Sequence, residues 1–170
     1  YGLTQIDVPS LWHRYKTTGA NTTVAVLDTG VDVANHSDLQ VGSDGWYDVI
    51  KNRNTPYDDN GHGTHVSGTV VGTTTGAGTN YGVAPNATLL HAKVFPGSGS
   101  TSFVNITHGM EWAVAHDAET DVISMSLGES GYHEEFIEPV QNARDAGVVV
   151  VAASGNNGPE TSSSPANVYE

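Results

Sequence analysis

The chain has no cysteine, which excludes disulfide bonds, thiolate metal sites and a thiol nucleophile. It also has no apolar run long enough to span a membrane, so we expect no membrane partner. Its first residues lack the basic and then apolar pattern of a signal peptide. The sequence therefore predicts a chain that is soluble or begins after processing.

Basic residues are scarce, because six Lys and Arg stand against 19 Asp and Glu and give a formal net charge of −13. A strongly acidic chain repels phosphate, so nucleic acid is not an expected partner. An ordinary acidic surface, a salt-rich environment and bound calcium each explain this charge. Four aspartates crowd the stretch before residue 62, although their spacing matches no EF-hand: Asp44, Asp48, Asp58 and Asp59.

The 170 residues, 37% of them hydrophobic, suffice for one domain or part of a larger one. Apolar segments and turn residues predict strands at 24–27, 87–94, 121–128 and 148–153. Helical patterns occupy residues 9–15, 62–71, 102–116 and 134–146. We expect surface segments at 32–60, with Trp46 and Tyr47 as anchors, at 72–80 and at 96–101. Strands separated by helices predict a three-layer α/β fold, with a mostly parallel sheet and helices on both faces.

His62 stands where a helix is predicted to begin, between Gly61 and Gly63. A helix start offers unpaired N–H groups and a positive dipole end, and the glycines allow close approach of another chain or a substrate. Such a place suits an imidazole that transfers protons. A histidine that only caps the helix remains the alternative.

Polar residues follow the predicted strands at the edge where sites assemble in parallel sheets. Asp28 ends the first strand, Ser126 to Gly128 end the third, and Asn156 follows the fourth. A buried carboxylate can fix the tautomer of an imidazole, and an Asn amide can donate to an oxyanion. Together with His62, these residues favour acyl transfer.

Four segments in this order resemble the subtilisin-like serine proteases (subtilases, peptidase family S8), and the acidic composition resembles their haloarchaeal members. They are VAVLDTGV at 24–31, NGHGTHVSG at 60–68, SMSLG at 124–128 and AASGN at 152–156. The resemblance implies a secreted serine endopeptidase that cleaves polypeptides, uses no organic cofactor and can partner a propeptide. In that family Asp28 would orient the base, His62 would act as base and acid, Asn156 would bind the oxyanion and His65 would be structural. Two segments would hold the substrate as an added strand: Gly99, Ser100 and Thr101, and Ser126, Leu127 and Gly128.

The sequence departs from the family pattern in lacking the Gly-Thr-Ser-Met-Ala segment that carries the nucleophile. We therefore expect residues 1–170 to be the amino-terminal portion of one peptidase domain, inactive alone and partnered by a complementary carboxyl-terminal segment. Residues 72–81 also differ from the loop of the family's calcium site, of which Asp38 alone matches an expected ligand. The acidic stretch before residue 62 adds Asp58 and Asp59 as candidate metal ligands. Glu129 replaces a common glycine, and either favours basic side chains at the pocket entrance or simply faces solvent.

Other readings of the motifs remain. The sequence Asp28-Thr-Gly30 resembles the aspartic protease signature, but that chemistry needs two such carboxylates and one copy is present. His62 and His65 could bind zinc, yet they lack the HExxH arrangement and a third ligand nearby. An inactive truncated subtilase, or a peptide-binding fragment using the same edge segments, is the non-enzymatic alternative.

Overall fold

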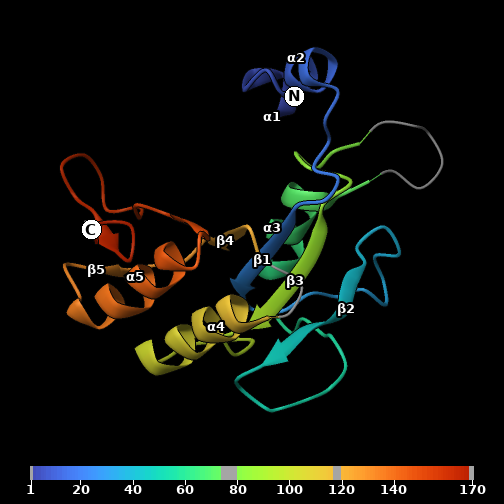
Figure 1. Cartoon of the computed structure of the whole chain (residues 1–170). Helices are drawn as coiled ribbons and strands as arrows, with labels where there is room; N and C mark the ends of the chain where they lie inside the picture. Colours follow the sequence, from blue (N-terminus) through green and yellow to red (C-terminus); the bar gives the residue numbers. More distant parts are fainter. Residues whose placement is uncertain (1, 74–79, 117–119, 169–170) are drawn as a thin grey trace.

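The computed structural model of the chain describes residues 2–73, 80–116 and 120–168, and a five-stranded sheet lies at its centre (Figure 1). The strand order is β2-β3-β1-β4-β6, and every neighbouring pair is parallel. The strands are β1 (Thr23–Asp28), β2 (Val41–Asp48), β3 (Thr88–Lys93), β4 (Val122–Met125) and β6 (Val149–Ala152). The predicted mostly parallel α/β fold is thus confirmed.

Helices cover both faces of this sheet. Helix α3 (His62–Val71) packs on one face, where Val26 and Val71 share a buried cluster. Helices α4 (Phe103–Ala115) and α5 (Ile137–Asp145) pack on the other, where Leu27 and Met110 share a second cluster. Side chains of the central strand β1 alternate between the two faces of the sheet. Since both faces are covered, every residue of β1 is buried.

Shorter elements complete the described part of the chain. Helices α1 (Gly2–Gln5) and α2 (Val8–Tyr15) precede the sheet, and the Trp12 indole donates to the Val83 carbonyl 2.9 Å away. A 3₁₀ turn, η1 (Glu134–Phe136), leads into α5. Strands β5 (Glu129–Ser130) and β7 (Ser163–Ser164) form an antiparallel ribbon beyond the end of β4. No helix within the described ranges is long and apolar enough to cross a membrane.

The prediction that residues 32–60 form only a surface connection is wrong, because β2 lies within them and pairs with β3. Its sequence, VGSDGWYD, has glycines and no clean alternation, and its register shifts between Val41 and Trp46. Pairing along β3 stabilises this strand despite its weak intrinsic preference. The two expected anchors lie on it: Trp46 stacks on His91 and Tyr47 on Trp112, with centroids 6.0 and 5.5 Å apart.

Other predicted elements are present, with shifted ends. Helix α3 has the predicted bounds, whereas β4 ends at Met125 rather than at residue 128. The predicted helix at 134–146 is divided into η1 and α5. Most of the predicted 72–80 loop, residues 74–79, lies outside the described residues.

Candidate active site

Strand β1 ends at Asp28 and helix α3 begins at His62, and these two termini bring the side chains together. Nδ1 of His62 lies 2.7 Å from Oδ1 of Asp28. The Asp28 side chain is 3% exposed, whereas that of His62 is 53% exposed. The carboxylate is therefore fixed inside the protein, while the imidazole remains accessible to a substrate.

The surroundings of Asp28 have opposing effects on its charge. Burial raises the pKa of the Asp28 carboxyl, and hydrogen bonds from His62 and from the Thr29 amide, 2.7 Å away, favour its ionised form. Oδ2 is buried and has no hydrogen-bond partner among the described residues. Asp28 can thus stabilise a positive charge that develops on the imidazole, because its carboxylate is buried and lies in direct contact with Nδ1.

A close contact between backbones sets the separation of the two side chains. A Cβ atom on Gly63 would lie 2.2 Å from the carbonyl oxygen of Gly30 and 3.1 Å from Cβ of Asp28. Only glycine allows the first turn of α3 to approach the end of β1 this closely. Gly61, by contrast, has φ +100° and open space at its Cβ position, so its role is conformational.

Asp58 connects the segments that carry Asp28 and His62. Its Oδ1 accepts from the Thr29 hydroxyl at 3.0 Å, and its Oδ2 accepts from the amide and hydroxyl of Thr64 at 3.0 and 2.6 Å. Burial acts to raise the pKa of Asp58, but hydrogen bonds from Gly61, Thr64 and Asn60 hold it below the ordinary value. The ionised Asp58 carboxylate therefore holds the start of α3 close to the end of β1.

A cleft of about 500 Å³ opens beside the Asp28–His62 pair, and the loop after β6 brings Asn156 to it. The third strand end contributes Ser126, Leu127 and Gly128, as the sequence indicated. The predicted second substrate segment, Gly99, Ser100 and Thr101, does not line this cleft. Thr101 instead bonds to the Val94 carbonyl and accepts from Asn105.

An accessible imidazole thus contacts a buried carboxylate at a cleft that Asn156 also lines. Comparison of the chain with known protein families agrees with this arrangement. A sequence model of the subtilase family matches residues 19–170. The chain belongs to the subtilase family. It is 40% identical over 165 residues to subtilisin E of Bacillus subtilis (strain 168), covering 96% of this chain and 42% of that protein.

Two further relatives are similar to the chain at slightly lower identity. Subtilisin Savinase of Lederbergia lenta is 38% identical over 166 residues, which cover 98% of this chain and 59% of that protein. Serine protease AprX of Bacillus subtilis (strain 168) is 38% identical over 156 residues, 85% of this chain and 35% of that protein. The chain therefore spans less than two thirds of the length of each of these relatives.

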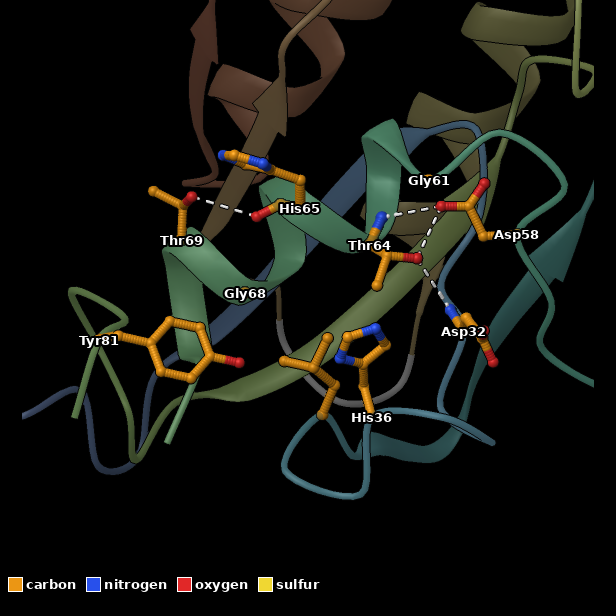
Figure 2. Close-up of a pocket in the computed structure, with 10 residues that line it drawn as sticks. Asp32, His36, Asp58, Gly61, Thr64, His65, Gly68, Thr69 and Tyr81 are labelled. Atoms are coloured by element: carbon orange, nitrogen blue, oxygen red, sulfur yellow. Dashed lines mark hydrogen bonds between the residues drawn. The ribbon is translucent and has the colours of Figure 1, made fainter. Parts of the chain in front are cut away.

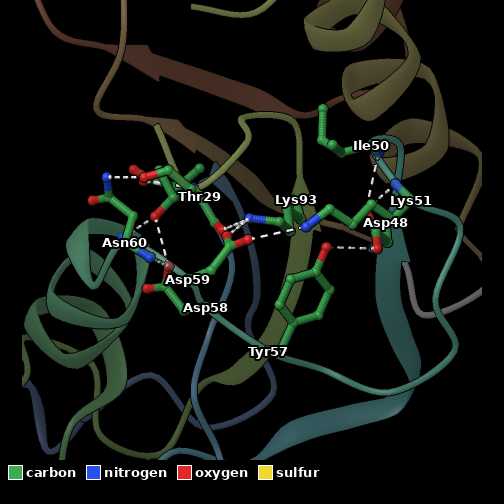
Figure 3. A network of polar contacts seen from close by, with 12 residues as sticks. Thr29, Asp48, Ile50, Lys51, Tyr57, Asp58, Asp59, Asn60 and Lys93 are labelled. Atoms are coloured by element: carbon green, nitrogen blue, oxygen red, sulfur yellow. Dashed lines mark hydrogen bonds and ion pairs between the residues drawn. The ribbon is translucent and has the colours of Figure 1, made fainter. Parts of the chain in front are cut away.

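A buried lysine ties this subtilase site to the sheet, and sequence reasoning missed it (Figure 3). Lys93, at the end of β3, is fully buried and donates to the Thr29 carbonyl. Its Nζ also lies 2.6 Å from Oδ1 of Asp59 and 4.9 Å from the Tyr57 ring centroid. The hydrogen bond from Lys93 is the main reason that the pKa of Asp59 is lowered. The sequence contained one signal for this buried lysine, because Lys93 is a charged residue within the predicted buried strand at 87–94.

The three candidate metal ligands have separate roles in the structure. Asp38 accepts from the Tyr81 hydroxyl, Asp58 binds the start of α3, and Asp59 lies between Lys93 and Lys51. No three His, Asp or Glu side chains of the described residues are grouped so that they could hold a metal ion. Each of the three therefore has a protein partner of its own, and calcium binding by them stays a prediction.

His65 lines a different pocket from the one beside His62. This second pocket of about 440 Å³ also contains His36, Asp32 and Tyr81 (Figure 2). Because His65 lies outside the cleft and no third metal ligand joins it in the described part of the chain, the structure provides no zinc site with His62.

Proposed function

We propose that this chain supplies the orienting acid, the general base and an oxyanion donor of a serine endopeptidase. The main support for this proposal is the 2.7 Å contact between Nδ1 of His62 and Oδ1 of Asp28, at the cleft that Asn156 also lines. Asp28 holds the tautomer with its proton on Nδ1, which leaves Nε2 to take a proton from a nucleophile. His62 then returns this proton to the leaving amine, and the Asn156 amide donates to the oxyanion.

We place the nucleophilic serine in a segment other than residues 1–170. The sequence lacks Gly-Thr-Ser-Met-Ala, and the cleft serines Ser126, Ser130 and Ser163 make no hydrogen bond to His62 within the described residues. The 170-residue chain alone then has no enzyme-like activity, because its base has nothing to activate. We further propose that the whole protein acts outside the cell on polypeptides, which pair with the edge segments as an added strand.

The test uses the protein that contains this chain together with its nucleophile segment, with peptide hydrolysis as the readout. Asp28→Asn and His62→Ala should each lower kcat/KM by about 10⁴ or more, because the base loses its tautomer or is removed. Asn156→Ala should lower kcat by about 10²–10³ with KM almost unchanged, because its hydrogen bond strengthens as charge develops.

Two controls make this test specific. His108→Gln, on an exposed site of α4, should leave hydrolysis unchanged. The 170-residue chain is assayed alone and after mixing with a segment that bears Gly-Thr-Ser-Met-Ala, and serine-inhibitor-sensitive activity is expected only in the mixture. Near-normal rates for His62→Ala, or peptide binding without any hydrolysis, would argue for the non-enzymatic alternative.

A further inference from the structure

Glu129 is an acidic residue on the wall of the cleft that holds His62 and Asn156. We infer that it makes the cleft select peptides with a lysine or arginine immediately before the scissile bond. This inference rests on the proposed function and names the substrate class of the same site. It is carried by the position of Glu129, by its lack of a partner and by the charge of the cleft.

The backbone at Glu129 is held in place on both sides. Glu129 pairs with Ser164 in the β5–β7 ribbon, and a Cβ on the preceding Gly128 would lie 3.1 Å from Cβ of Ser163. On the following residue, the Ser130 hydroxyl accepts from the Asn157 amide at 2.6 Å, which joins the two walls of the cleft. The Cα atom of Glu129 is therefore held on the wall of the cleft, and its exposed side chain can reach a group that enters the cleft.

The carboxylate of Glu129 has no ion pair or hydrogen bond among the described residues. The described residues that line the cleft include no Lys or Arg, and Asp28 is their only other acid. Asp28 is already committed to His62. Glu129 is thus the one lining carboxylate that remains available for a cationic group brought by a ligand.

The location of the cleft decides which substrate residue brings this cation. Asn156 and His62 both line it, so the carbonyl that is attacked must lie at the same opening. The side chain that enters beside this carbonyl belongs to the residue just before the scissile bond, and about 500 Å³ is ample for lysine or arginine. The net charge of −13 also raises the encounter rate of cationic peptides.

The experiment compares peptides that differ only at the residue before the scissile bond, which is Arg, Lys, Gln or Glu. Hydrolysis is measured with the protein that contains this chain and its nucleophile. We expect kcat/KM to be about fivefold or more higher for Arg and Lys than for Gln, and lower still for Glu. The preference should weaken at high salt, since the pair is exposed to solvent.

Glu129→Gln and Glu111→Gln change the net charge equally, so comparing them separates a local contact from net charge. Glu129→Gln should remove the preference for Arg over Gln, and a third variant, Glu129→Lys, should favour the Glu peptide. Glu111→Gln, which removes an exposed carboxylate of α4, should keep the ratio. Equal hydrolysis of the Arg and Gln peptides, or an equal loss of preference in Glu129→Gln and Glu111→Gln, would overturn the inference while leaving the proposed function intact. Failure to hydrolyse any peptide would overturn the proposed function and this inference with it.

Discussion

Asp58 does not line the cleft, but its hydrogen bonds help to position the segments that carry Asp28 and His62. Its hydrogen bonds to Thr29 and Thr64 connect the end of β1 to the start of α3. Asp58→Asn keeps the shape but replaces one accepting oxygen by a donor, which leaves at least one buried group unsatisfied. We expect the free energy of unfolding in urea to fall by about 1–3 kcal/mol. Asp145→Asn, exposed at the end of α5, is the control and should change little.

His91 is a second residue whose effect follows from burial. It is fully buried on β3, its Nδ1 lies 3.0 Å from the Ser67 hydroxyl, and its Nε2 has no partner among the described residues. Burial lowers the pKa of His91 from 6.5 to about 3. Between these values the unfolded chain binds a proton that the folded chain does not, so stability must decrease as the pH falls from 6.5 to 3.

The pH dependence of stability therefore tests the state of His91. We expect its contribution to the free energy of unfolding to change by at most about 1.4 kcal/mol per pH unit below pH 6.5. His91→Ala removes this slope, whatever its effect on stability at neutral pH, whereas His108→Gln retains it. Urea titrations between neutral and mildly acidic pH give both slopes. Parallel curves for wild type and His91→Ala would show that His91 does not titrate in this way.

At the scale of elements, the contact of α3 with β1 depends on glycine. A side chain at Gly63 would meet the Gly30 backbone at 2.2 Å, so α3 must shift away from β1 to accept one. Gly63→Ala should therefore destabilise the fold by about 1–3 kcal/mol and separate His62 from Asp28. Thermal unfolding measures the first effect, and peptide hydrolysis by the whole protein measures the second.

The control for this helix–strand contact is Gly2→Ala in α1, where a Cβ atom would meet nothing within 4 Å. It should leave both measurements unchanged. Wild-type stability and rate in Gly63→Ala would mean that α3 and β1 adjust to one another more freely than close packing allows.

At the scale of the whole molecule, the net charge of −13 is the dominant feature. Lys51 and Lys93 both form ion pairs with Asp59, so their positive charges neutralise little of the remaining negative charge. Added salt should raise the melting temperature by screening self-repulsion. A salt series, measured with and without a chelator, checks this expectation. A melting temperature that responds only to the chelator would instead indicate bound metal.

The open face of the sheet is a second feature of the whole molecule. Val149 and Val151 on the edge strand β6 are 57% and 53% exposed, whereas Val26 of the central strand β1 is buried in the cluster that includes Val71 of α3. Adjacent exposed valines on an edge strand favour association with another apolar surface. Uncovered, this face would lower the solubility of the chain.

The sequence by itself determined the elements whose patterns are local and strong. Apolar residues 24–27 followed by Asp28 predicted a buried strand, and the glycine-flanked His62 predicted the first residue of α3. These predictions succeeded because a buried parallel strand needs apolar residues on both faces and a helix start has its own composition. The order of the four motifs also predicted the subtilase family, and the family model matches residues 19–170, which contain all four.

The tertiary structure alone decided what depends on partners distant in the chain. Strand β2 exists because β3 pairs with it, and only folding brings Asp58 to the Thr64 hydroxyl and Asp59 to Lys93. Likewise, only the tertiary structure brings Glu129 and His62 to one cleft, where none of the described lining residues is Lys or Arg. A charged or weakly patterned residue has no fixed role in the sequence, because its energy depends on which groups folding places around it.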